Sequence, residues 1–240
     1  MLKSTRTLIA GLVAALSVAS TASAIVGGSV DGDAHPYVGA LVVDDAIVCS
    51  GVLVAPTVFA TAAHCLDGLA DGARVAVSLD SSLDRTSWTL LAGSAHADPQ
   101  YRGKTAHDLA AVVLDRPAAP RPATLPVRNQ VELLSRGALV TSVGYGYSAV
   151  LGRRDFAYDG LRHVAESTVR DVSANVLTIS TKLAGPCLGD SGGPQLLGDT
   201  VLAITSSGSK DCSGTSESYR LDGSDARAFL GGFRVSAGTP

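Results

Sequence analysis

The sequence predicts an all-β fold, a barrel or a sandwich, and three observations lead to this prediction. Short apolar runs recur between turn signals along nearly the whole chain. The 26 glycines and 10 prolines supply those turns, and several of the runs are rich in β-branched residues. Hydrophobic residues make up 46% of the 240-residue chain, which is enough for a substantial core.

Eight apolar runs are predicted to be strands, and several lack polar alternation, as expected of strands buried on both faces. Their even spacing favours a barrel or sandwich over a helical bundle. The runs are residues 37–43, 51–63, 74–79, 88–95, 109–114, 137–146, 175–180 and 200–207. Only one segment is predicted to be helical, around residues 224–230, with Ser224 at its N-cap.

A proline-rich stretch at residues 115–128 is predicted to be an extended connection halfway along the chain. Two interpretations stay open at this point. The stretch either joins two halves of the molecule or forms one long surface loop.

The first 24 residues have the three parts of a secretory signal peptide. A basic start is followed by an apolar segment too short to span a bilayer, and then by the cleavage motif Ala22-Ser23-Ala24. We expect a cleaved signal and a secreted, extracellular protein with no membrane attachment afterwards. An uncleaved anchor is the alternative.

Charge and cysteine content restrict the function classes further. Charged residues are only 17% of the chain, the net charge is −3, and no basic run suggests nucleic-acid binding. Four cysteines in an exported chain indicate two disulfides, for which three pairings are possible. Their spacing does not suit a zinc site, so no metal site is predicted.

Ser191 lies in the sequence GDSGG, which also satisfies the G-x-S-x-G pattern of α/β-hydrolases. That pattern requires a histidine later in the chain, yet none follows His163. The α/β-hydrolase interpretation is therefore excluded, and any base for Ser191 must come from upstream.

Two upstream histidines stand out, His64 before Cys65 and His107 before Asp108. A serine hydroxyl becomes a good nucleophile only when a base takes its proton, and a carboxylate must orient that base. His64, Asp108 and Ser191 would supply the three roles. The alternative is a structural histidine and a turn-capping aspartate, and His107 is interpreted as a structural neighbour of Asp108.

Four motifs, in order and at similar spacings, resemble the chymotrypsin/trypsin-like family of secreted serine endopeptidases. They are IVGG (25–28), TAAHC (61–65), HDLAAVVL (107–114) and CLGDSGGP (187–194). The resemblance covers nearly all of residues 25–240. It implies two antiparallel six-stranded β-barrels, with the active site in the cleft between them and their junction within residues 115–135.

The resemblance also implies roles for individual residues. His64 is the general base, Asp108 its orienting carboxylate and Ser191 the nucleophile, while the N–H groups of Gly189 and Ser191 form the oxyanion hole. Disulfides Cys49–Cys65 and Cys187–Cys212 are implied. No cofactor is required, the expected partners are protein or peptide substrates and proteinaceous inhibitors, and a monomer is expected.

In this family a freed N-terminal Ile-Val-Gly-Gly inserts its ammonium beside the aspartate preceding the nucleophile, here Asp190. A buried carboxylate requires such a partner. Ile25 follows the predicted signal cleavage site directly. We therefore expect signal peptidase itself to produce the active terminus.

The resemblance places Gly185, Ser206, Gly208 and Glu217 around the substrate pocket. Gly185 stands where trypsin-like specificity would require an aspartate. Glu217 either brings negative charge to the pocket base and selects Arg or Lys, fills the pocket, or points to solvent. Basic or mixed specificity is favoured slightly over small apolar residues.

The functional prediction is a secreted serine endopeptidase that acts through an acyl-enzyme. A catalytically silent trypsin-like scaffold used for protein binding is the alternative, and an esterase on the same fold is a third interpretation. The silent relatives usually lose a triad residue, and none is lost here.

The position of the signal gives the first testable prediction. N-terminal sequencing of the exported protein should begin at Ile25, because Ala22-Ser23-Ala24 precedes it directly. Any other starting residue would contradict activation by signal peptidase.

Overall fold

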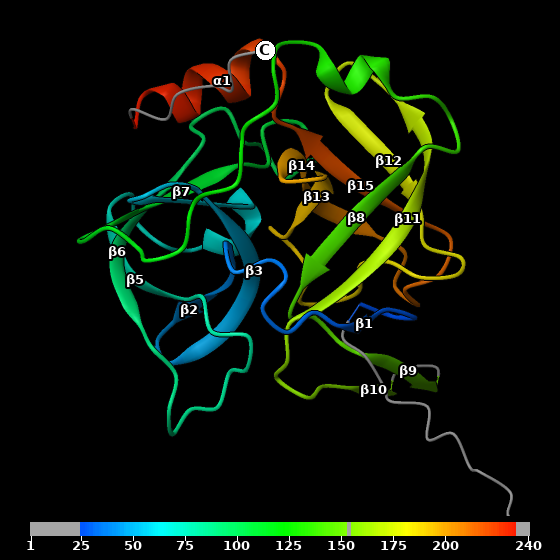
Figure 1. Cartoon of the computed structure of the whole chain (residues 1–240). Coiled ribbons are helices and arrows are strands. Elements are labelled where there is room, and N and C mark those ends of the chain that lie inside the picture. Colours follow the sequence, from blue (N-terminus) through cyan, green and yellow to red (C-terminus); the bar gives the residue numbers. More distant parts are fainter. Residues whose placement is uncertain (1–24, 153–154, 234–240) are drawn as a thin grey trace, which may run out of the picture.

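The computed structural model describes residues 25–152 and 155–233, and it consists of two β-barrels side by side (Figure 1). The predicted signal peptide lies outside the described residues. Within them, no helix is both long and apolar enough to cross a membrane.

The first barrel is a closed ring of six antiparallel strands in the order β2-β3-β4-β7-β6-β5. The predicted strand at 51–63 is in fact two, because the chain reverses between β3 and β4 at Pro56 and Thr57. Proline cannot donate to the ladder and is suited to this turn. The strands are β2 (Val38–Val43), β3 (Ala46–Ala55), β4 (Val58–Thr61), β5 (Ala73–Ser78), β6 (Leu91–Ala97) and β7 (Ala110–Leu114).

The second barrel is also a ring of six antiparallel strands, closed by the pairing of β8 with β11. A two-residue strand, β1 (Ser29–Val30), adds to the outside of β11. The six are β8 (Leu139–Gly144), β11 (His163–Val172), β12 (Val176–Ser180), β13 (Pro194–Leu197), β14 (Thr200–Gly208) and β15 (Thr215–Arg220). The prediction of two six-stranded barrels is confirmed.

Smaller elements complete the fold. The hairpin of β9 (Ala149–Gly152) and β10 (Asp155–Ala157) projects from the second barrel (Figure 1). Two short 3₁₀ helices are η1 (Ala63–Leu66) and η2 (Gln130–Leu133), and the C-terminal helix is α1 (Ser224–Gly231). Helix α1 confirms the predicted helix, but its N-cap is Gly223, because Ser224 already lies inside the first turn.

The buried guanidinium of Arg162 ties the N-terminal segment and both barrels together. Its side chain is 1% exposed and donates to the Asp31 carboxylate at 2.8 Å. It also donates to the carbonyl oxygens of Val38 and Leu79 and to the hydroxyl of Tyr145. These partners satisfy most of the donors of a charge that would otherwise be costly to bury.

Replacing Arg162 should therefore be severely destabilising. The variant Arg162→Leu leaves Asp31 with one fewer cationic partner in a buried site, and we expect a loss of about 3 kcal/mol of unfolding free energy. Guanidinium denaturation would measure it. The matched control is Arg74→Leu, which breaks an Arg–Asp pair of which both side chains are more than half exposed, and its stability should hardly change.

Candidate active site

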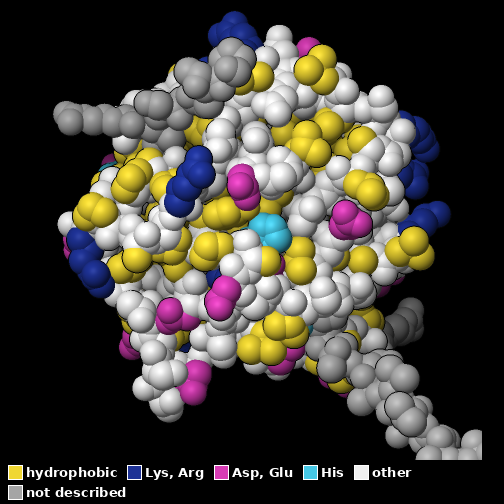
Figure 2. All heavy atoms as spheres, viewed as in Figure 1, with side chains coloured by type: hydrophobic (Ala, Val, Ile, Leu, Met, Phe, Trp, Pro, Cys, Tyr) yellow, Lys and Arg dark blue, Asp and Glu magenta, His cyan; other side chains and the backbone are white. Residues whose placement is uncertain are grey.

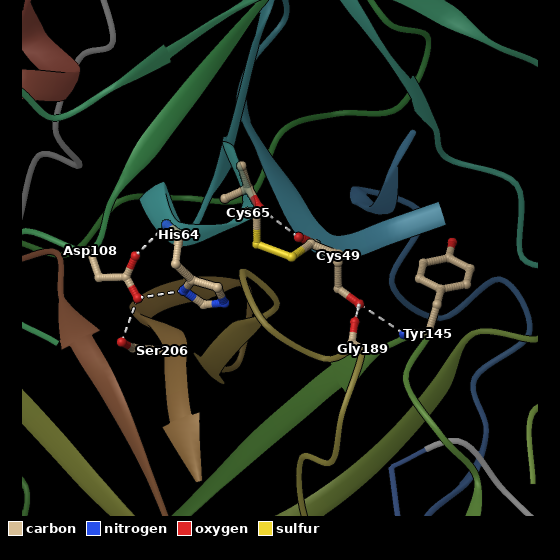
Figure 3. The surroundings of a disulfide bond; sticks show 9 residues. Cys49, His64, Cys65, Asp108, Tyr145, Gly189 and Ser206 are labelled. Carbon is tan, nitrogen blue, oxygen red and sulfur yellow. Dashed lines mark hydrogen bonds and ion pairs between the residues drawn. A yellow bond between two sulfur atoms is a disulfide. The ribbon is translucent and has the colours of Figure 1, made fainter. Parts of the chain in front are cut away.

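His64 and Asp108 are joined by two hydrogen bonds where the two barrels meet (Figure 3). His64 lies in η1 just after β4, and Asp108 lies just before β7. His64 Nδ1 is 2.8 Å from Asp108 Oδ2, and the backbone N–H of His64 donates to Oδ1 at 2.9 Å. Because Nδ1–H donates to a carboxylate, the other ring nitrogen is left as the basic one, and it points away from Asp108 in Figure 3.

The Asp108 carboxylate is 1% exposed and is held from a second direction by Ser206. The Ser206 hydroxyl, on β14 of the other barrel, donates to Oδ2 at 2.5 Å. Donors from both barrels, the backbone N–H of His64 in η1 and the Ser206 hydroxyl on β14, therefore fix the carboxylate that orients His64. Figure 2 shows a histidine side chain exposed near the middle of this face, between the barrels.

Ser191 lies in a turn that is pressed against the residues immediately before His64. The Ser191 carbonyl accepts a hydrogen bond from the N–H of Ser50 at 2.9 Å. A Cβ on the neighbouring Gly192 would stand 2.1 Å from Thr61 Oγ1 and 2.9 Å from the Ala62 nitrogen, so only glycine fits there. Among the described residues, no hydrogen bond joins the Ser191 hydroxyl to His64.

Gly189, which the resemblance places in the oxyanion hole, has a backbone conformation and surroundings that only glycine suits. Its φ of +94° lies in the left-handed region, and a Cβ would stand 2.8 Å from Gly146 Cα. The Ser50 hydroxyl donates to the Gly189 carbonyl at 3.0 Å and accepts the N–H of Tyr145 at 2.9 Å. Ser50 was not singled out from the sequence, because a single serine just ahead of an apolar run carries no distinguishing signal.

The side chain of Asp190 points into the interior and meets two backbone donors. The N–H groups of Gly146 and Cys187 donate to it at 2.8 and 2.9 Å. It is 1% exposed, and no cation among the described residues pairs with it. Burial raises the pKa of this carboxyl to about 7, against which the two backbone hydrogen bonds act.

Ile25 is buried, and it forms no ion pair with Asp190. Its neighbour Val26 forms a β-bridge with Gly185. The expected pair requires a free α-ammonium, which exists only after residues 1–24 are removed. In the intact chain the Ile25 nitrogen is an amide.

The family model described as Trypsin matches residues 24–220. The chain belongs to the trypsin family. Human granzyme M is 33% identical over 219 residues, which cover 82% of this chain and 84% of that protein. Brachyurin of Leptuca pugilator is 28% identical over 188 residues, covering 72% of this chain and 81% of brachyurin.

Solved structures share the fold at lower identity. Neuropsin, a serine protease expressed in the limbic system of mouse brain, has a TM-score of 0.72 at 20% identity and covers 88% of this chain and 100% of its own. Human heparin binding protein has the same TM-score and identity, covering 90% and 100%. At this identity the likeness establishes the trypsin-like fold alone.

Both disulfides that the trypsin-family resemblance implies are present. Cys49 is bonded to Cys65 beside His64, and Cys187 to Cys212 at the start of the Ser191 turn. Cys49, His64 and Cys65 are also the one group of potential metal-ligating side chains among the described residues. Because the two sulfurs are bonded to each other, they are not free thiolates for a metal.

The remaining residues that the resemblance places at the substrate pocket are Gly185, Gly208 and Glu217, and the two glycines have different surroundings from Glu217. A Cβ on Gly185 would stand 2.6 Å from Thr181 Cγ2, which is too close to fit, whereas a Cβ on Gly208 would make only ordinary contacts with Thr215 and Ser216. Glu217 is exposed, and its carboxylate accepts hydrogen bonds from Thr105 at 3.1 Å and Ser207 at 3.3 Å. It lines a cavity of about 440 Å³ with His64.

Strand alternation explains the placement of Glu217. On β15, Ser216 and Ser218 are buried and Glu217 between them faces outward. Three alternatives were weighed from the sequence: at the pocket base, filling the pocket, or pointing to solvent. The exposed carboxylate of Glu217 lies at the mouth of the cavity beside His64 and is nearest to the third alternative.

His107 contacts Asp98 and Asp225 and does not contact the Ser191 turn. Its Nδ1 is 3.1 Å from the Asp98 carboxylate.

The raised pKa of Asp190 predicts how stability depends on pH in a chain that keeps Ala24 ahead of Ile25. The carboxyl titrates near 3.8 when unfolded and near 7 when folded, so between these values the folded state binds more protons. Stability should therefore fall as pH rises from about 4 to about 7, by up to about 4 kcal/mol.

Denaturation of Ala24–Pro240 across this pH range would measure the effect. Asp190→Asn should flatten the profile, whereas Asp33→Asn, at an exposed carboxylate, should leave it in place. An unchanged slope in Asp190→Asn would contradict the assignment.

Proposed function

We propose that the mature chain, Ile25–Pro240, is a secreted serine endopeptidase that works through an acyl-enzyme on Ser191. The observation that carries the proposal is the oriented His64–Asp108 pair, with Ser191 in a turn packed against the strand end before His64. Membership of the trypsin family and the likeness to granzyme M support it.

The proposed reaction has two halves. Ser191 Oγ attacks the scissile carbonyl carbon while His64 Nε2 takes the hydroxyl proton, and Asp108 stabilises the resulting imidazolium. The N–H groups of Gly189 and Ser191 bind the oxyanion. The C–N bond breaks as His64 gives its proton to the leaving amine, and water then repeats the sequence to release the acid.

We propose that removal of residues 1–24 completes the site. The freed ammonium of Ile25 would pair with Asp190, whose carboxyl is buried, has no cationic partner within residues 25–152 and 155–233, and has a pKa raised to about 7. Pairing with the ammonium favours the ionised carboxylate and fixes the Gly189–Ser191 backbone. The predicted secretory signal and the two disulfides support an extracellular location.

Substrates of this proposed enzyme are proteins or peptides. Gly185 and Gly208 leave the pocket wall without side chains, and Glu217 stands at the cleft mouth beside His64. This placement supports a contact between Glu217 and the bound substrate outside the specificity pocket. It does not support a role for Glu217 as a negative charge at the base of that pocket. A monomer that proteinaceous inhibitors can block remains our expectation.

A silent binding scaffold is the second candidate, since the fold is shared with heparin binding protein. The residue set argues against it, because His64 and Asp108 keep the geometry that a base needs.

A serine-directed fluorophosphonate probe and cleavage mapping in a diverse peptide mixture test the proposal. Ile25–Pro240 should take up the probe and cut peptides, and Ser191→Ala should abolish labelling and lower cleavage by about 10⁴-fold or more. Ser213→Ala, at an exposed serine, is the matched control. Folded protein with a verified Ile25 terminus and no labelling would favour the scaffold.

A further inference from the structure

Asp98, a buried acid that takes no part in the reaction described above, contacts both sequence neighbours of Asp108. Its backbone N–H donates to the Leu109 carbonyl at 2.8 Å, and its carboxylate lies 3.1 Å from Nδ1 of His107. Asp98 follows the last residue of β6, and residues 107–109 lead into β7, which pairs with β6. One position at the end of β6 therefore holds the backbone on both sides of Asp108.

The Asp98 carboxylate depends on His107 for one of its hydrogen bonds. Asp98 is 3% exposed, and the N–H of Gln100 donates to its Oδ1 at 2.8 Å. Within residues 25–152 and 155–233, His107 is the one side chain that hydrogen-bonds to this carboxylate. Because a carboxylate only accepts, Nδ1 of His107 carries the proton. Without it, a buried oxygen would lose its donor, which is costly.

The backbone of His107 is held in a conformation that side chains disfavour. Its φ is +62°, in the left-handed region, and few residues other than glycine adopt it. The Leu109 N–H donates to the His107 carbonyl at 2.8 Å, and the Asp108 N–H donates to the Thr105 carbonyl at 3.3 Å. This tight turn sets the direction in which the Asp108 side chain leaves the backbone, and such a turn persists only where its surroundings hold it.

The imidazole of His107 is also in contact with the second barrel and with α1. Its ring lies 5.8 Å from the ring of Tyr219 on β15, centroid to centroid, and Nε2 is 3.8 Å from the carboxylate of Asp225 in α1. The side chain is 19% exposed. Because the ring is held between Asp98, Tyr219 and Asp225, its position is fixed, and the backbone that it shares with Asp108 is fixed with it.

The Asp108 carboxylate requires exact placement, because its two oxygens accept three hydrogen bonds at once (Figure 3). Oδ1 meets the backbone N–H of His64, while Oδ2 meets both Nδ1 of His64 and the Ser206 hydroxyl. A rotation of the carboxylate that improves one of these bonds lengthens another. Displacements below 1 Å in such a group are enough to slow a reaction severalfold.

We propose that Asp98 and His107 form a positioning pair, which fixes the Asp108 carboxylate and through it the orientation of His64. The inference rests on the proposed function and adds two residues to its machinery. Neither residue touches the reacting atoms, so both act through Asp108.

The first test compares two replacements of His107 in Ile25–Pro240. His107→Leu removes the hydrogen bond to Asp98, and we expect kcat for a peptide amide to fall about tenfold with KM within about twofold of wild type. His107→Asn should restore kcat to within about threefold. Asparagine tolerates the left-handed region, and its amide nitrogen, like Nδ1 of histidine, is bonded to Cγ and can donate to Asp98. Titration with the fluorophosphonate gives the concentration of active enzyme.

A spectroscopic measurement reports the positioning directly and without substrate. The proton shared by His64 Nδ1 and the Asp108 carboxylate lies in a short, charge-assisted hydrogen bond, and its NMR signal is expected far downfield of the backbone amide protons. The signal should shift or broaden in His107→Leu and keep its position in His107→Asn.

His96→Leu is the matched control. Nδ1 of His96 is also bonded to an aspartate, Asp71, at 2.9 Å, and its side chain is 26% exposed, but it lies on β6 away from the turn that carries Asp108. Both kcat and the low-field signal should stay at their wild-type values. An equal loss in this control would contradict the assignment.

Asp98→Asn tests the same pair where His107→Leu does not fold. It keeps the size of the side chain and weakens the acceptor, so kcat should fall about threefold at unchanged KM, with a shifted low-field signal. Wild-type kcat and an unshifted signal in a folded variant, or a raised KM at unchanged kcat, would overturn the inference.

Failure of the two proposals can be told apart. Absence of hydrolysis and of probe labelling from folded protein with an Ile25 terminus overturns the proposed function and, with it, this inference. Normal hydrolysis that neither His107→Leu nor Asp98→Asn slows overturns the inference alone.

Discussion

The Ser191 turn depends on one residue of the other barrel, Ser50, which bonds to it through both backbone and side chain. The Ser50 N–H donates to the Ser191 carbonyl and its hydroxyl to the Gly189 carbonyl. Its own carbonyl accepts the hydroxyl of Thr61, three residues before His64. A single position on β3 thus holds the turn and the strand end before His64 in one hydrogen-bonded group.

This arrangement accounts for the glycines around Ser191. The turn lies so close to β3, β4 and β8 that side chains at Gly192 and Gly146 would overlap Thr61 and the Asp190 carboxylate. The close approach also excludes water from Asp190, and this burial raises the pKa of its carboxyl to about 7. The close packing of the turn is therefore the common cause of the glycines around Ser191 and of the raised pKa of Asp190.

Sequence patterns predicted the barrels well where strands are apolar, and poorly where they are not. The runs at 37–43 and 109–114 correspond to β2 and β7, which are almost wholly buried. Strand β11 was not predicted, because alternate residues such as Glu166 face solvent, and β15 was not predicted, because Ser216 and Ser218 are polar although buried. Neither strand presents an apolar run.

The candidate site, like the barrels, was predicted from the sequence only in part. The disulfide pairing was implied by the family resemblance that four motifs carry, because the cysteine count alone left three pairings open, and the same motifs contain the residues of the His64–Asp108 pair. Glu217 could not be placed, because the pairing of β14 with β15 shifts register between Thr205 and Ser207, and such a shift decides which face a side chain takes. Ser50 and Arg162 act through contacts distant in sequence, which no local pattern reports.

The anchoring of Asp31 by Arg162 sets the length of the tether that precedes it. Asp31 is fixed between the barrels, so a terminus freed at Ile25 is joined to a rigid point by only six residues. A chain of that length reaches at most about 20 Å, and a group on so short a tether has an effective concentration on the order of millimolar. The ammonium would reach Asp190 as an intramolecular ligand, so the switch would respond to cleavage alone and be insensitive to dilution after export.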